Sequence, residues 1–141
     1  MSTFVPKKFK YKKIHKNVTV KNTKDFKINV LNSSVCGLKI LKSGTISSIV
    51  FEAVRRIIRR KTKKEGSLYI NGFPSIPVTK KAIGLRMGKG VGSVDSWVYS
   101  VKKGRILFEL KNISLELGKI ALKAAANKLN LPSKIIYNYS K

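Results

Sequence analysis

The chain has 141 residues, of which 31 are Lys or Arg and 6 are Asp or Glu, so its formal net charge at pH 7 is +25. A hydrophobic content of 43% is enough for a folded core, whereas one Cys (Cys36) and one His (His15) exclude a disulfide framework and a thiolate zinc site. No apolar run approaches the ~18 residues of a membrane span, so we expect one compact basic domain that binds a polyanion, without a metal or cofactor.

The first 30 residues are predicted to form a basic arm ahead of a globular domain at 31–141. They contain nine lysines and one acid, Asp25, with Phe4, Phe9, Tyr11 and Ile14 among the lysines. Lysines attract phosphates, and aromatic rings stack on exposed bases or pack into grooves. The alternative is a solvated tail that only keeps the protein soluble.

The first elements of the globular domain are a short strand at 33–41, a break at Ser43-Gly44 and a long helix. Thr45 is the expected N-cap of this helix, and Gly66 is expected to end it. Apolar residues follow the helical repeat and predict the buried face: Ile46, Ile49, Val50, Ala53, Val54, Ile57 and Ile58. Another face carries Arg55, Arg56, Arg59, Arg60 and Lys63, which favours contact with nucleic-acid phosphates because Arg binds them in bidentate fashion.

The second half alternates strands with one more helix. We expect a strand at 68–70, an irregular connection at 71–74 with Pro77, and two strands, 96–101 and 106–110, joined as a tight hairpin through 102–105. Ser114 is predicted to cap a helix that runs to about Leu129, and 135–139 to return as a strand. The pattern predicts an α+β fold with an antiparallel sheet, two main helices, the basic arm and a glycine-rich loop.

That loop is the most informative segment. Gly84, Gly88, Gly90 and Gly92 allow the backbone to adopt positive φ and to approach another surface closely. The spacing does not match a P-loop, which has four residues between its first glycine and Gly-Lys-Ser/Thr, nor a dinucleotide-binding GxGxxG motif. We interpret it as a thin cationic loop that fits between RNA helices.

The sequence of residues 84–110, GLRMGKGVGSVDSWVYSVKKGRILFEL, closely resembles the signature of universal large-subunit ribosomal protein sixteen in its bacterial and organellar form. The resemblance also covers the opening PKKFKYKKIHK at 6–16, the helix residues EAVRR at 52–56, and 122–129. Val91 stands where members of that family usually carry a second lysine.

The resemblance implies a non-enzymatic, structural constituent of the large ribosomal subunit. Such a protein binds large-subunit ribosomal RNA, helps to shape the aminoacyl-tRNA site near the peptidyl-transferase centre, joins late in assembly and contacts neighbouring ribosomal proteins. By position, the residues implied to bind ribosomal RNA are Lys7, Lys8, Lys10, Lys12, Lys13, His15, Lys16, Arg55, Arg56 and Arg59. The loop implied to face tRNA contains Arg86, Met87, Gly88, Lys89 and Gly90.

Two other function classes are compatible with only part of the sequence. A DNA-binding nucleoid protein is compatible with the charge, but no helix-turn-helix or basic zipper is visible. An RNA-processing enzyme is disfavoured because the six carboxylates are scattered, with Glu52 and Glu116 expected on helix surfaces.

Lys, Asn and Ile make up 49 of the 141 residues, a bias of AT-rich coding sequence. This bias, together with the lack of an import signal in the sequence, favours a mitochondrial genome. A plastid genome or an AT-rich bacterium is the alternative.

Overall fold

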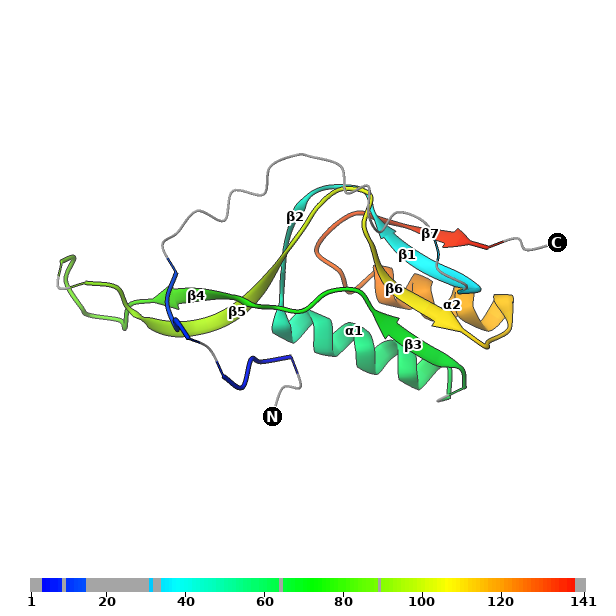
Figure 1. Cartoon of the computed structure of the whole chain (residues 1–141), viewed down its shortest axis with the longest axis horizontal. Coiled ribbons are helices and arrows are strands. Elements are labelled where there is room, and N and C mark those ends of the chain that lie inside the picture. The colour runs from blue at the N-terminus through cyan, green and yellow to red at the C-terminus, as the bar shows by residue number, and fades with distance from the viewer. Residues whose placement is uncertain are drawn as a thin grey trace.

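The computed structural model of the chain describes residues 4–8, 10–14, 31, 34–63, 65–88 and 90–138. Figure 1 shows an elongated molecule with one long hairpin extending from a body of helices and strands. In chain order the elements within the described residues are β1 (Cys36–Ile40), β2 (Gly44–Ser47), α1 (Ser48–Lys61), β3 (Ser67–Ile70), β4 (Ile76–Lys80), β5 (Ser93–Val101), β6 (Ile106–Lys111), α2 (Leu115–Ala126) and β7 (Ser133–Tyr137). The predicted α+β fold with antiparallel pairing is confirmed.

The strands form two antiparallel sheets. The body contains a four-stranded sheet in the order β3-β6-β1-β7, and α1 and α2 lie together along one side of it (Figure 1). The second sheet has the order β2-β5-β4, and its β4–β5 pair is the extended hairpin. The glycine loop connects β4 to β5 and therefore lies at the tip of the hairpin, far from the helices.

The predicted hairpin at 102–105 is wrong, because β5 and β6 belong to different sheets. Val98 and Val101 of β5 pair with β2, whereas Phe108 and Leu110 of β6 pair with β1. The segment between them bends the chain from one sheet to the other, and its Gly104 takes a φ of 92°. Two β-rich runs around a Gly-containing tetrapeptide are locally indistinguishable from a hairpin, since only the partners of each strand differ.

The start of α1 also differs from the prediction. Thr45 lies in β2, paired with Ser100, and the N-cap is Ser47, whose Oγ accepts a hydrogen bond from the Val50 N–H at 3.4 Å. At the other end the helix stops at Lys61, before Gly66, whose φ of +64° serves the turn into β3. The helix is therefore shorter than predicted at both ends.

The buried face of α1 agrees with the predicted one at Val54 and Ile58, which are fully buried, and differs from it elsewhere. Ile49 is 71% exposed, whereas Phe51, which the periodicity argument left out, is fully buried. Ile46 is buried too, but as part of β2. In α2, Ser114 caps the helix as predicted and Ala121 and Ala125 are buried.

Aromatic rings join the two sheets at Phe51. Its ring centroid lies 5.6 Å from that of Phe4, 5.8 Å from that of Tyr99 in β5 and 5.8 Å from that of Phe108 in β6. Aromatic pairs at these separations are stabilising beyond the area they bury. Phe51 thus connects the arm, the base of the hairpin and the main sheet through one side chain.

Pro77 lies within β4, opposite Trp97, and not in an irregular connection. The position tolerates proline because β4 is an edge strand of its sheet, where a missing N–H removes no required ladder bond.

Candidate nucleic-acid interface

The shape of the glycine loop depends on glycine at four positions for two different reasons. Gly84, Gly88 and Gly90 have φ of 88°, 100° and 83°, in the region that side chains rarely adopt. Gly92 instead lies against backbone, since a Cβ there would stand 2.3 Å from the Lys80 carbonyl oxygen. The loop can therefore turn sharply and still close tightly onto the end of β4.

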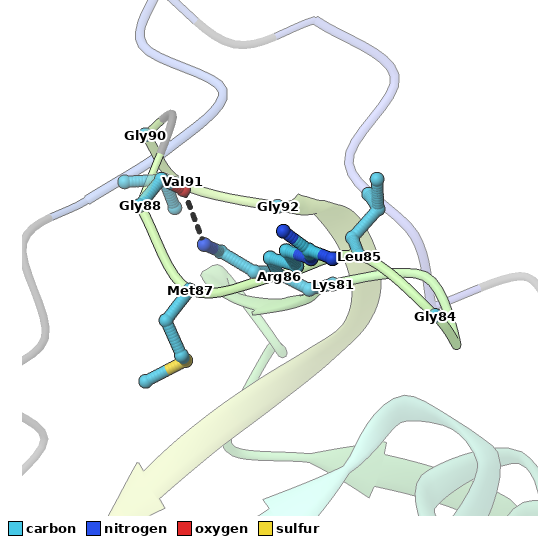
Figure 2. A pocket seen from close by; sticks show the side chains of 9 residues that line it. All are labelled: Lys81, Gly84, Leu85, Arg86, Met87, Gly88, Gly90, Val91 and Gly92. Carbon is cyan, nitrogen blue, oxygen red and sulfur yellow. Dashed lines mark hydrogen bonds between the residues drawn. The ribbon is translucent and has the colours of Figure 1, made fainter.

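A lysine holds the loop in a ring. The Lys81 Nζ donates a hydrogen bond to the Gly88 carbonyl oxygen at 2.6 Å, and Figure 2 shows its side chain crossing the ring. The half-open hollow lined by the loop has a volume of about 470 Å³. Sequence reasoning did not assign a role to Lys81, although a lysine next to a glycine-rich loop is the kind of residue that could have been suspected.

The predicted loop residues lie at the far end of the hairpin and are exposed. Arg86 has no partner within the described part of the chain, and Met87 is 93% exposed and points away from the hollow (Figure 2). Lys89 lies outside the described residues. The loop thus offers at least one unpaired guanidinium on a narrow backbone.

Large apolar side chains flank Arg86 along the loop, and the sequence analysis did not single them out. Ile83 is 100% exposed, and Leu85, Met87 and Val91 are exposed as well. Exposed apolar groups at a protruding tip mark a contact surface, since such side chains are otherwise covered. The tip therefore combines one cation with four side chains able to pack against flat, apolar surfaces such as base faces.

The described part of the arm contacts the loop through Lys13. Lys7, Lys8, Lys10, Lys12 and Lys13 are exposed, and the Lys13 Nζ donates to the Val91 carbonyl oxygen at 3.2 Å. His15 and Lys16 lie outside the described residues. Arm and loop thus contribute to one cationic region although 78 residues separate Lys13 from Val91.

One aromatic residue of the arm has a different role from the one expected. Phe4 is only 9% exposed and belongs to the hydrophobic core, next to Phe51 and Phe73. It anchors the arm and is not available for base stacking. Tyr11 and Ile14 are exposed, as base-stacking or groove-packing groups must be.

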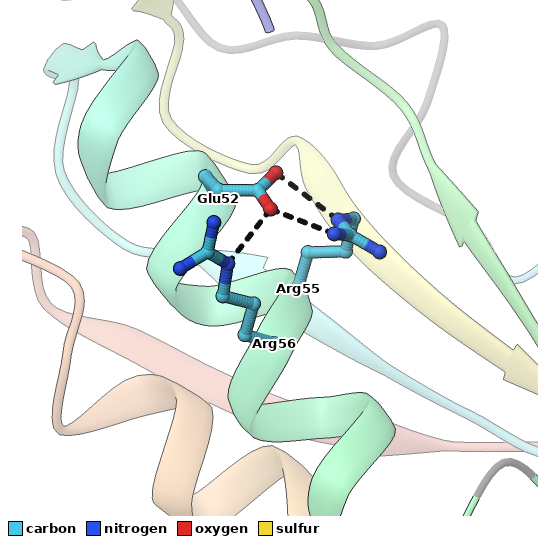
Figure 3. A network of polar contacts seen from close by, with 3 residues as sticks. All are labelled: Glu52, Arg55 and Arg56. Carbon is cyan, nitrogen blue, oxygen red and sulfur yellow. Dashed lines mark hydrogen bonds and ion pairs between the residues drawn. The ribbon is translucent and has the colours of Figure 1, made fainter. Parts of the chain in front are cut away.

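The arginines of α1 are more constrained than the sequence indicated. Arg55 and Arg56 both form ion pairs with Glu52, which is 7% exposed and not a surface group as predicted (Figure 3). The hydrogen bond to Glu52 raises the pKa of the Arg55 guanidinium, so the group stays charged. Arg59 donates to the Gly66 carbonyl oxygen at 3.2 Å, and Arg60 is exposed.

The chemistry of these groups is that of anion binding. Among the residues that the structure describes, no three His, Cys, Asp or Glu side chains are placed to hold a metal ion. Of the helices described, none is long and apolar enough to cross a membrane. Exposed Lys and Arg side chains together with open backbone suit a polyphosphate.

Comparison with known proteins gives a consistent result. Residues 6–136 match the family described as "Ribosomal protein L16p/L10e". A large ribosomal subunit protein uL16c of Helicosporidium sp. subsp. Simulium jonesii is 42% identical over 134 residues, covering 95% of this chain and 96% of the relative. The uL16 protein of Psychrobacter arcticus is 41% identical over 132 residues (93% and 94% of the two chains), and that of Buchnera aphidicola subsp. Cinara cedri is 39% identical over 132 residues (94% and 93%).

Proposed function

The chain belongs to the ribosomal protein L16p/L10e family and is thus a structural constituent of the large ribosomal subunit, not an enzyme; from this premise we propose how it binds there. The basic arm and the arginines of α1 bind large-subunit ribosomal RNA. The tip of the β4–β5 hairpin faces the aminoacyl-tRNA near the peptidyl-transferase centre and helps to shape its site.

The observation that carries this proposal is the meeting of arm and loop at the tip of the hairpin. Lys13 contacts Val91, so the arm lysines and Arg86 belong to one region that extends beyond the core. A cationic region on a thin support reaches phosphates that a rounded surface cannot. Neutralising those phosphates releases counterions, and binding is therefore expected to weaken steeply as salt rises.

The arm and the domain at 31–141 have separate roles in this proposal. The arm at 1–30 supplies screened attraction to RNA, with Lys7, Lys8, Lys10, Lys12, Lys13, His15 and Lys16 as its contacts. The domain positions the loop residues Arg86, Met87, Gly88, Lys89 and Gly90 and the helix residues Arg55, Arg56 and Arg59. Ile49 and Ile120, exposed on the two helices, are candidate contacts for neighbouring ribosomal proteins.

The ribosome in question is proposed to be mitochondrial. The support is the bias toward Lys, Asn and Ile, which make up 49 of 141 residues, as expected for an AT-rich genome. A plastid or bacterial ribosome is the alternative, and the relatives compared above include a uL16c and bacterial proteins. Locating the coding sequence in organellar or bacterial DNA decides between them.

The experiment separates the two regions by charge removal that leaves Phe4 in place. One variant changes Lys7, Lys8, Lys10 and Lys12 to Gln, and a matched control changes the exposed Lys102, Lys103, Lys123 and Lys128 to Gln. A third variant is Arg86→Ala, with Lys128→Ala, which removes one exposed cation outside the proposed contacts, as its control. Each is added to large subunits depleted of their own family member, and incorporation and aminoacyl-tRNA accommodation are measured.

We expect the arm variant to lower incorporation and Arg86→Ala to slow accommodation on subunits that have incorporated it normally. The control variants should change incorporation and accommodation less than the arm variant and Arg86→Ala do. Equal loss of incorporation in the arm variant and in Arg86→Ala would contradict the separate roles, and a wild-type protein that never incorporates would contradict the proposed function itself.

A further inference from the structure

A buried carboxylate lies between two arginines on α1. The Arg55 Nε and Nη2 donate to the two oxygens of Glu52 at 3.1 and 2.7 Å, and the Arg56 Nε donates to Oε1 at 2.9 Å. The Glu52 side chain is 10% exposed, whereas those of Arg55 and Arg56 are 37% and 66% exposed (Figure 3). The carboxylate is thus on the inner side and the guanidiniums are on the outer side.

The contacts leave a defined set of donors toward solvent. A guanidinium has five N–H groups. Arg55 uses its Nε and one Nη2 donor on Glu52, and Arg56 uses only its Nε, so both terminal nitrogens of Arg56 and the Nη1 of Arg55 stay available. Neither arginine has another partner among the residues described. Two forks are therefore held side by side, each with free N–H groups.

We propose that Glu52 is a positioning residue that holds Arg55 and Arg56 as a clamp for one phosphodiester group of large-subunit ribosomal RNA. The inference rests on the proposed function and names a contact within it. Arginine side chains lose considerable rotamer freedom when they bind, and a side chain already held in place loses less. Glu52 fixes the Nε side of each guanidinium and leaves the terminal side for the phosphate, whose oxygens match that fork.

The proposal and simple electrostatics predict opposite changes in RNA affinity when the negative charge of Glu52 is removed. A polyanion is attracted more strongly when a negative charge is removed from its partner, so Glu52→Gln should tighten RNA binding if only net charge matters. If Glu52 positions the two arginines, the same substitution should weaken binding, because the amide accepts these hydrogen bonds more weakly and no longer attracts the cations.

The matched control is Glu65→Gln. Glu65 is exposed, follows the end of α1 and has no side-chain partner among the described residues, so this variant removes the same charge without affecting an arginine. The probe is a transcript of large-subunit ribosomal RNA, and the dissociation constant is measured at one fixed salt concentration. We expect Glu65→Gln to bind as tightly as wild type or more tightly, and Glu52→Gln to bind roughly threefold to tenfold more weakly, the effect of freeing one or two long side chains.

A double-mutant cycle shows whether Glu52 acts through the arginines. In a background with Arg55→Gln and Arg56→Gln, the substitution Glu52→Gln is expected to cause no further weakening. Arg56→Lys, at an exposed position that does not endanger folding, keeps the charge but loses the fork, and it should also weaken binding. A structural role of Glu52 alone would weaken binding equally in both backgrounds.

The outcomes are distinguishable. If the wild type binds the transcript and Glu52→Gln binds at least as tightly as Glu65→Gln, the positioning role is refuted and the proposed function stands. The same holds if Glu52→Gln weakens binding equally with and without the two arginines. If the wild type does not bind, the proposed function fails and the clamp fails with it.

Discussion

The Lys13 ammonium group donates a hydrogen bond to the main-chain carbonyl oxygen of Val91, so the arm lies against the glycine loop. The bond is exposed, and bonds of this kind typically add about 1 kcal/mol or less to stability. Its main effect is on position, because it holds Lys13 of the arm beside the glycine loop. The arm is also held near its start by Phe4, and these two attachments define its path over the hairpin.

The first prediction concerns the anchor of the arm. Phe4→Ala should lower the free energy of unfolding by about 3 kcal/mol, because a nearly buried ring is lost from its contacts with Phe51 and Phe73. Urea unfolding followed by circular dichroism measures this. Tyr11→Ala, at a side chain 67% exposed, is the control and should change stability by less than about 0.5 kcal/mol. Similar small effects of both variants would show that Phe4 is not part of the core.

The second prediction concerns the contact of α2 with β1. Alanine in place of a helical glycine usually stabilises by about 1 kcal/mol, but a Cβ at Gly118 would lie 2.6 Å from the Cys36 Sγ. Gly118→Ala should therefore destabilise, by about 1–2 kcal/mol, through overpacking. Cys36→Ala removes the sulfur, and the double variant should be more stable than the sum of the single effects predicts, by about 1 kcal/mol. Thermal or urea unfolding of the four proteins tests this, and strict additivity would contradict it.

The third prediction is a pH dependence. Burial raises the pKa of the Cys36 thiol from its ordinary value of 9.0 to about 11. The folded state holds this proton more tightly than the unfolded chain does, so the contribution to stability is complete below pH 9 and is lost as pH rises toward 11. The loss amounts to roughly 2–3 kcal/mol.

Lysines also titrate in this range, so the quantity to measure is the difference in unfolding free energy between wild type and Cys36→Ala. That difference should shrink between pH 9 and pH 11. A difference that stays constant with pH would show that the thiol titrates alike in both states.

The fourth prediction distinguishes two kinds of glycine in the loop. Gly92→Ala places a Cβ against the backbone of Lys80, so β4 and β5 must separate locally, whereas a Cβ at Gly88 meets no atom within 4 Å. Gly88→Ala is strained only through its φ of 100°, at a cost of about 1–2 kcal/mol within the loop. Hydrogen exchange should show lost protection in the β4–β5 ladder for Gly92→Ala and retained protection for Gly88→Ala. Equal protection in both variants would contradict the different roles given to Gly88 and Gly92.

Local signals in the sequence predicted much of the fold. The Ser114 cap of α2 and the strands at β1, β3 and β7 were placed from caps, breaks and β-rich runs, which are short-range features. The partition into two sheets was not predictable in this way. Val98 pairs with Ser47 of β2 and not with the strand that follows it in sequence, and this choice is made by tertiary contacts.

The same distinction applies to the candidate interface. Residue types and spacing identified the loop and the cationic segments as candidates, and their roles stay predictions. The spacing of Glu52, Arg55 and Arg56 is that of neighbours on a helix, but periodicity could not show that the carboxylate is buried. Phe4 was misread for a similar reason, because an aromatic residue among lysines carries no local mark of its place in the core.

Ser47 is both the last residue of β2, opposite Val98, and the N-cap of α1. No flexible connection therefore separates the sheet that carries the loop from the helix that carries the arginines. In the proposed function, an RNA that engages both the loop and the arginines must present its two contacts at the spacing that this direct junction sets. The proposed contacts would then form together only on RNA that is already folded to that spacing.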